Sequence, residues 1–135
     1  MTITDYERIT HQFLERWNSH DVERLVACYT PDLVYRDPNT RGEVRGADAF
    51  RSYLTKLFAS WRMHWTARQL FPLADTTGVA ALWQATLGPV GSDRTLEITG
   101  VDLVVLEGDL VKRNEVYFDR AALAPLLSED LKVTA

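Results

Sequence analysis

The feature that most constrains how this chain folds is a predicted β-hairpin near its C-terminus. Two runs rich in β-branched, aromatic and leucine residues, Leu96–Glu107 and Leu110–Phe118, flank the pair Gly108-Asp109. A Gly-Asp pair between two such runs is typical of a two-residue hairpin turn. With this turn, Asp102 is expected to lie directly opposite Glu115 on the neighbouring strand.

The predicted Asp102/Glu115 pair can be interpreted in two ways. Directly opposed side chains lie roughly 4.5–5.5 Å apart. Two carboxylates at that distance cannot both ionise freely, so one is expected to have a raised pKa and could act as a general acid beside a general base. Arg113 lies on the same face, however, and the three residues could instead form a solvated salt-bridge cluster. The hairpin alone leaves both interpretations open.

Length and composition indicate one soluble domain, residues 1–135, in a chain of 135 residues that is 46% hydrophobic and 25% charged. The net charge of −4 disfavours a nucleic-acid partner. No apolar run is long enough for a membrane span and the first residues lack a signal-peptide pattern, so we expect no membrane partner and a cytoplasmic protein. The three histidines lie in separate elements without ligand spacing, so we expect no metal site and no cofactor.

The order of the remaining elements predicts an α+β fold. Apolar residues at helical spacing, capping residues and turn signals predict three helices with one short strand among them, then long strands, then a short last helix. The expected ranges are 5–17 and 21–29 for the first two helices, 33–37 for the short strand, 47–61 for the third helix, 63–73 and 79–87 for the strands before the hairpin, and 120–127 for the last helix, with a frayed tail at 128–135. Helices segregated on one face of a curved antiparallel sheet would leave a conical cavity, where small molecules bind.

Several short motifs, in this order, resemble the NTF2-like superfamily and, within it, the SnoaL-like polyketide cyclases. The resemblance covers residues 5–127. Its carriers are Trp17-Asn18-Ser19-His20-Asp21, the stretch from Tyr29 to Pro38, Arg45-Gly46, Thr99-Gly100-Val101-Asp102, Glu107-Gly108-Asp109-Leu110 and Val116-Tyr117-Phe118-Asp119. The resemblance implies a cone of three N-terminal helices packed on a curved antiparallel sheet. It also implies a homodimer formed through the outer face of the sheet.

The resemblance assigns roles to the two hairpin acids. In SnoaL-like cyclases the general base stands seven residues after the turn glycine, which is Glu115 here. In ketosteroid isomerase a protonated aspartate on the preceding strand donates a hydrogen bond, and Asp102 resembles it. Both matches place the pair inside the cone, so Val101, Leu103, Val105, Val116 and Phe118 are expected on the outer face.

Further candidate residues come from the first strand and from the neighbours of Glu115. Limonene epoxide hydrolase, another protein of this fold, carries a tyrosine and an asparagine that align with Tyr35 and Asp37, and Asp37 could equally be a turn-former before Pro38. Trp83 aligns with a cavity position. The other tryptophans, Trp17, Trp61 and Trp65, are expected in the core.

Three more side chains are candidates for contact with a substrate. Tyr117 shares the face of Glu115 and could orient a carbonyl or a water, and Arg113 could tune a neighbouring carboxylate. His64 is a weaker candidate, because a single histidine on a strand is more often exposed or hydrogen-bonded than catalytic.

The function expected from this sequence is that of a cofactor-independent isomerase or cyclase. Glu115 would remove a proton next to a carbonyl group of a small, mainly apolar molecule, and Asp102, with Tyr35 or Tyr117, would hydrogen-bond the developing enolate. One alternative is an epoxide or lactone hydrolase that activates water with Glu115, Tyr35 and Asp37. Residues Ala81 and Trp83 stand where limonene epoxide hydrolase needs an arginine and an aspartate, which places this alternative second. Another alternative is a non-catalytic module that binds a small ligand.

Overall fold

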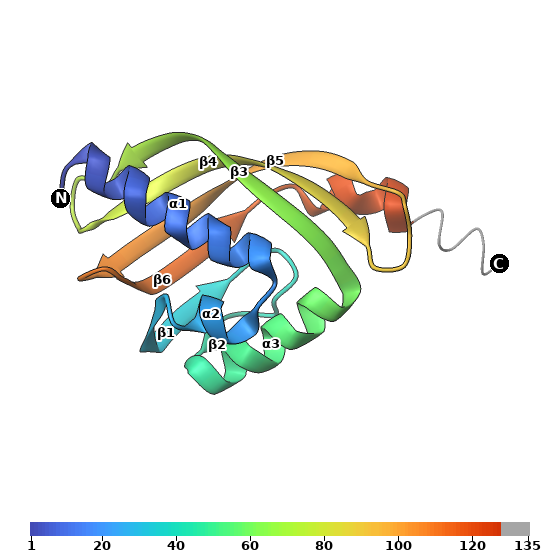
Figure 1. Cartoon of the computed structure of the whole chain (residues 1–135), viewed down its shortest axis with the longest axis horizontal. Helices are drawn as coiled ribbons and strands as arrows, with labels where there is room; N and C mark the ends of the chain where they lie inside the picture. The colour runs from blue at the N-terminus through green and yellow to red at the C-terminus, as the bar shows by residue number, and fades with distance from the viewer. Residues whose placement is uncertain (128–135) are drawn as a thin grey trace.

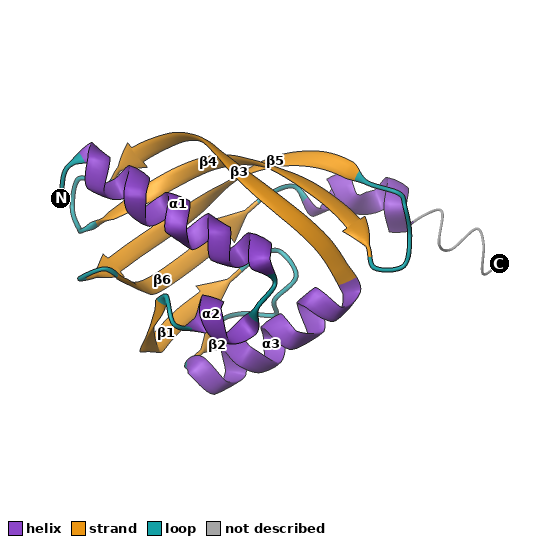
Figure 2. Ribbon diagram, in the orientation of Figure 1, coloured by secondary structure: helices purple, strands orange, loops and turns teal. Residues whose placement is uncertain are grey.

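The chain folds into a curved six-stranded sheet with helices covering its inner face (Figures 1 and 2). The computed structural model describes residues 1–127; the predicted frayed tail, residues 128–135, lies outside the described residues. The elements in chain order are α1 (Ile3–Ser19), α2 (Val22–Val26), β1 (Tyr29–Arg36), β2 (Val44–Arg45), α3 (Ala47–Ser60), β3 (Trp61–Pro72), β4 (Gly78–Pro89), β5 (Leu96–Glu107), β6 (Leu110–Tyr117) and the 3₁₀ helix η1 (Arg120–Leu123). The expected α+β class and element order are confirmed.

Helix α1 lies across the sheet because one of its faces is apolar. Thr2 caps it in a capping box with Asp5, so the helix begins two residues earlier than the sequence pattern predicted. Its buried residues recur at helical spacing: Tyr6, Ile9, Thr10, Phe13, Leu14 and Trp17. This face packs on β3 and β4 and forms one wall of the interior.

The sheet order is β2-β1-β6-β5-β4-β3. Strands β3 to β6 form an antiparallel meander as expected, whereas β1 pairs with β6 in parallel. The short strand β2 falls in a segment that the sequence predicted as loop, and it pairs with β1. Helix α3 packs against α2 and contacts β1, β2 and β3 (Figure 1).

The register of the β5–β6 hairpin corrects the central expectation from the sequence. The turn is as predicted, with Gly108 at φ +61° and Glu107 opposite Leu110. A β-bulge at Lys112 then adds one residue to β6, so that Asp102 faces Val116 and Glu115 faces Leu103. Because side chains alternate between the two faces of a sheet, this shift of one residue places Asp102 and Glu115 on opposite faces.

The bulge also divides the residues expected on the outer face. Val101, Leu103 and Val105 do lie there, half-buried, whereas Val116 and Phe118 turn inward and line the interior. Within residues 1–127, no helix is long and apolar enough to cross a membrane.

Candidate active site

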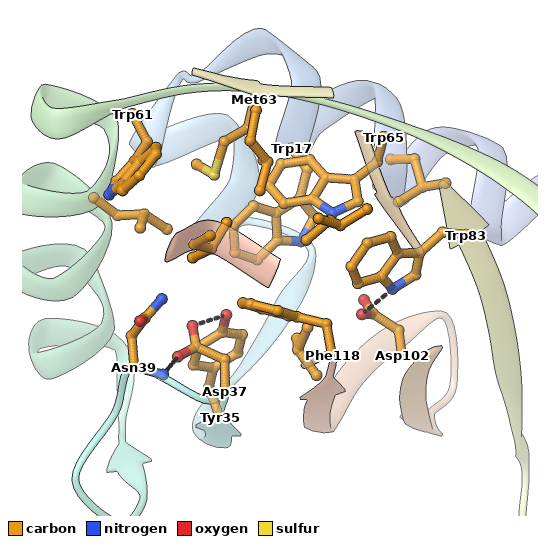
Figure 3. A pocket seen from close by; sticks show the side chains of 16 residues that line it. Trp17, Tyr35, Asp37, Asn39, Trp61, Met63, Trp65, Trp83, Asp102 and Phe118 are labelled. Atoms are coloured by element: carbon orange, nitrogen blue, oxygen red, sulfur yellow. Dashed lines mark hydrogen bonds between the residues drawn. The ribbon is translucent and has the colours of Figure 1, made fainter. Parts of the chain in front are cut away.

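A pocket opens between α1, α3 and the inner faces of β3 to β6 (Figure 3). The centre of a water molecule can occupy about 50 Å³ of it, and about 640 Å³ of space lies between its side chains when the part open to solvent is included. The lining is mainly apolar and consists of Leu14, Trp17, Tyr35, Asp37, Asn39, Leu57, Trp61, Met63, Trp65, Trp83, Leu87, Ile98, Asp102, Val116, Phe118 and Leu123. Apolar walls with a few polar groups are typical of small-molecule sites.

All four tryptophans of the chain line this pocket. Three of their rings make a continuous aromatic wall: the Trp17 and Trp65 ring centroids are 5.3 Å apart, and those of Trp65 and Trp83 are 6.4 Å apart. Phe118 extends the wall from Trp83, at 6.2 Å. The expected pocket position of Trp83 agrees with this geometry. The other three tryptophans, expected only as core, also face the pocket, because a packing pattern identifies inward side chains without showing whether they enclose space.

Asp102 is the buried acid of the pocket, with only 6% of its surface exposed. Its Oδ1 accepts a hydrogen bond of 2.9 Å from the indole nitrogen of Trp83 (Figure 3). Burial raises the pKa of Asp102 to about 7, although hydrogen bonding to Trp83 and Asn114 acts in the opposite direction. A carboxyl group with this pKa can both accept and give a proton near neutral pH.

Gly100 allows Trp83 to reach Asp102. Trp83 on β4 pairs with Gly100 on β5, and the indole ring crosses β5 there towards Asp102, two residues further on. A Cβ atom at residue 100 would lie 2.5 Å from Cζ2 of Trp83 and 2.5 Å from the backbone oxygen of Tyr117. Glycine is therefore needed here for a close approach rather than for an unusual backbone angle.

Asn114 on β6 is a buried polar neighbour of Asp102. It is fully buried, accepts a hydrogen bond of 2.8 Å from the Tyr29 hydroxyl and donates one of 3.3 Å to the backbone oxygen of Leu103. The bulge in β6 turns Asn114 to the inner face, where it pairs with Val104. Sequence reasoning missed Asn114 because the unbulged register places it outside.

Asp37 is the second acid of the pocket, and its oxygens are occupied by hydrogen bonds. Oδ2 accepts from the Tyr35 hydroxyl at 2.6 Å and also from the Tyr53 hydroxyl. Oδ1 accepts from the backbone N–H groups of Asn39, at 2.7 Å, and Thr40, at 3.1 Å. Asp37 is thus a pocket-lining residue that also forms a turn, and both interpretations of this residue hold.

Tyr35 is bound to Asp37 rather than free to contact a ligand. Burial and the charge of Asp37 hold the pKa of its phenol well above the usual value, so the hydroxyl stays protonated and donates to that carboxylate. The Asn39 side chain, by contrast, points into the mouth of the pocket (Figure 3). It was not singled out from the sequence.

Glu115 lies on the outer face of the sheet and does not line the pocket. Its carboxylate accepts hydrogen bonds from Arg113 and from the Tyr117 hydroxyl, on either side of it along β6. Burial alone would raise the pKa of Glu115, but these hydrogen bonds and the charge of Arg113 lower it. The expected cavity-facing Asp102/Glu115 pair is wrong, and the salt-bridge interpretation describes Glu115, Arg113 and Tyr117.

His64 is exposed and lines a separate groove between α1 and β3. In the described residues, no group of three or more histidine, cysteine or acidic side chains is arranged to hold a metal ion. The site therefore consists of one buried, titratable carboxyl group in an aromatic pocket, with a hydrogen-bonded second carboxylate near the mouth.

The curved sheet, its covering helices and this pocket define an α+β protein of the NTF2-like class. The sequence profile of the SnoaL-like domain matches residues 10–114, and the chain belongs to this family. A comparison with curated proteins finds no match.

Solved structures show the same fold at low sequence identity. A candidate isomerase from Bacillus subtilis has a TM-score of 0.82 at 13% identity over 95% of this chain and 96% of its own. A protein of ketosteroid isomerase-like fold from Catenulispora acidiphila, in complex with trimethylamine, has a TM-score of 0.77 at 13% identity over 87% of this chain and 90% of its own. A candidate polyketide cyclase from Pseudomonas putida has a TM-score of 0.75 at 14% identity over 87% of this chain and 94% of its own.

Proposed function

We propose that this protein is a cofactor-independent enzyme that moves a proton on a small, mainly apolar carbonyl compound, in an isomerisation or a ring closure. The observation that carries the proposal is the carboxyl group of Asp102, buried in a tryptophan-lined pocket and held by the Trp83 indole at 2.9 Å. A carboxyl group in such a place does not serve to stabilise the fold, because burying it costs free energy. Perturbed acids in pockets are characteristic of catalytic sites.

Asp102 takes the role of proton acceptor in this proposal. Its carboxylate removes a proton from the carbon next to the carbonyl group, which gives an enolate and a neutral Asp102. In an isomerisation, Asp102 returns the proton to another carbon of the conjugated system. In a ring closure, the enolate carbon attacks a second carbonyl group, and Asp102 protonates the alkoxide that forms.

A neutral donor in the pocket wall, the Asn39 amide at the mouth, would bind the developing oxyanion (Figure 3). Asp37 is less suited to act as the base, because hydrogen bonds from four donors already occupy both of its oxygens. We assign it to positioning Tyr35 and the Asn39 backbone.

The hydrolase alternative lacks its base in this structure. It required Glu115, Tyr35 and Asp37 around one water molecule, and Glu115 lies on the other face of the sheet. A non-catalytic binding module is the second candidate, favoured by the enclosed aromatic wall. The two candidates differ in one respect: a binding module needs no proton transfer at Asp102.

The first prediction uses hydrogen exchange at carbon, which needs no knowledge of the natural substrate. The protein is incubated in D₂O with a panel of small ketones and 1,3-diketones, and deuterium next to the carbonyl group is measured by mass spectrometry. We expect the protein to accelerate this exchange for apolar members of the panel and Asp102→Asn to reduce the acceleration by about 10²–10⁴-fold.

Glu115→Gln is the matched control, since it removes the other hairpin carboxylate from outside the pocket. It should retain the exchange activity of the unchanged protein. Equal activity of Asp102→Asn and the unchanged protein would contradict the enzyme proposal. Ligand binding that survives Asp102→Asn, without any exchange, would favour the binding module.

We also propose that two chains pair through the outer face of the sheet. Val101, Leu103 and Val105 are half-buried there on β5, and Phe71 and Tyr117 are 48% and 51% exposed. Apolar surface of this kind usually marks an interaction site. The pocket opens on the other face of the sheet, so pairing would leave it accessible.

A further inference from the structure

A second, smaller cavity touches Asp102 on the side of α1. It lies between this helix and the sheet, and its lining includes Thr10 and Phe13 of α1, Val79 and Ala81 of β4, and Asp102 and Val104 of β5. The centre of a water molecule can occupy about 10 Å³ of it. Because the centre of a water molecule has room to move there, the cavity can hold at least one water molecule.

The cavity has two polar side chains, Asp102 and Thr10, which are 6% and 5% exposed. The Trp83 indole engages Oδ1 of Asp102, which leaves acceptor positions on the carboxyl group. The Thr10 hydroxyl makes no hydrogen bond to another group in residues 1–127. Purely apolar cavities of this size stay dry, whereas a water needs two to four polar partners. The side chains of Asp102 and Thr10 supply two.

Thr10 also faces solvent on its other side. Together with Leu14 it lines the groove between α1 and β3, which opens along the edge of the sheet. Glu7, His11 and His64 are among the polar residues of that groove. Thr10 therefore stands between the small cavity at Asp102 and bulk water, on a path that does not pass through the main pocket.

We propose that the small cavity binds one water molecule between Asp102 and Thr10. This water and the Thr10 hydroxyl form a proton path from Asp102 to the groove between α1 and β3. The water site stands on the cavity alone, and its use as a proton path rests on the proposed function. A substrate that fills the main pocket would block exchange with solvent there, and this second path would allow Asp102 to change its protonation state during turnover. Thr10 is a positioning residue in this scheme.

The water site is tested by NMR, through cross-relaxation between a long-lived water and neighbouring protons. We expect a water signal at the Thr10 methyl group and at the Trp83 indole N–H in the unchanged protein. Thr10→Val, which replaces the hydroxyl with a methyl group, should remove it, and Thr10→Ser should restore it. Thr30→Val is the matched control: it removes another buried threonine hydroxyl, one that has no hydrogen-bond partner among the described residues and lines neither cavity. It should leave the signal in place.

The proton path is tested in the deuterium assay. When Asp102 moves a proton within one substrate molecule, exchange with solvent competes with return of the same proton. Thr10→Val should raise the share of returned protons several-fold, without a matching change in KM, and Thr10→Ser should behave as the unchanged protein does. An unaltered share in Thr10→Val would overturn the path.

The outcomes of these experiments distinguish failure of the water site from failure of the proposed enzyme function. Absence of the water signal from the unchanged protein overturns the inference, whatever the activity. A water signal lost only in Thr10→Val, in a protein whose Asp102→Asn variant exchanges deuterium as the unchanged protein does, supports the water site and contradicts the proposed enzyme function.

Discussion

At the scale of single residues, Asp102 is a buried acid: 6% of its surface is exposed, and burial raises its pKa to about 7. The sequence predicted a raised pKa for one acid of the Asp102/Glu115 pair, with Glu115 as the candidate base, because the two were expected to lie opposite each other. The chemistry of a buried acid depends on what surrounds it in three dimensions, and the residues next to Asp102 in space come from β4 and β6. Asp37 and Tyr35 could be identified from the first strand, but the contribution of Tyr53 from α3 could not.

The raised pKa of Asp102 predicts how stability changes with pH. Between about pH 4 and pH 7 the folded chain keeps a proton on Asp102 that the unfolded chain has lost, so folding becomes less favourable as pH rises through this window. The difference from the model-peptide value corresponds to about 4 kcal/mol above pH 7. Asp102→Asn, which stays neutral, should therefore be more stable than the unchanged protein at pH 8 by about 2–4 kcal/mol.

Urea unfolding at about pH 3.5 and at pH 8 measures this difference. Near pH 3.5 the two proteins should be close in stability, because Asp102 is largely protonated in both the folded and the unfolded chain. Other groups also change the stability with pH: the pKa of Glu115 is lowered, so its contribution is lost as the pH falls below its ordinary pKa. Such contributions are the same in both proteins and cancel when the two are compared at one pH. A constant difference at both pH values would show that Asp102 titrates normally.

At the scale of elements, the hairpin was predictable and its bulge was not. Gly108-Asp109 marks the turn in the sequence, since glycine accepts the positive φ of +61°. Lys112 gives no comparable signal: a lysine fits an exposed strand position as well as a bulge. One extra residue nevertheless decided which face of β6 meets the pocket, and with it the positions of Asn114, Glu115 and Val116.

Two single-residue deletions in β6 should therefore have very different effects. Deletion of Lys112 removes the extra residue and leaves every later side chain of β6 on its present face, so it should cost only about 1–2 kcal/mol. Deletion of Glu115 lies beyond the bulge. It turns Val116 outward and Tyr117 inward, and should cost more than about 3 kcal/mol or prevent folding.

Urea unfolding of both deletion variants is the measurement, with Lys112→Ala as the control of unchanged length. Similar losses from the two deletions would mean that β6 can slide along β5, and that the bulge does not set the faces of the strand.

At the scale of the whole molecule, the order of elements was sufficient to predict the cone, and the sequence profile of the SnoaL-like domain agrees with it. The residues that line the pocket were harder to predict. Three of its four tryptophans come from α1 and β3, and in the sequence they look like ordinary core residues. The outer face was predicted only in part, since the bulge moved Val116 and Phe118 to the interior.

Pairing of two chains through the outer face of the sheet can be tested by a substitution in that face. Leu103→Glu places a charge among Val101, Val105 and the neighbouring strand, so it should convert a dimer to a monomer and halve the mass measured by light scattering after size-exclusion chromatography. Ser52→Glu, which adds the same charge to an exposed position of α3, should leave the mass unchanged. A monomer at all concentrations before any substitution would refute pairing through this face.

The aromatic wall has a practical consequence for finding the ligand. Because every tryptophan of the chain lines the pocket, the tryptophan emission of this protein comes wholly from the place where a small molecule would sit. The protein carries its own optical probe. A compound library can be screened by changes in intensity or wavelength of that emission, without a label, a coupled assay or advance knowledge of the reaction.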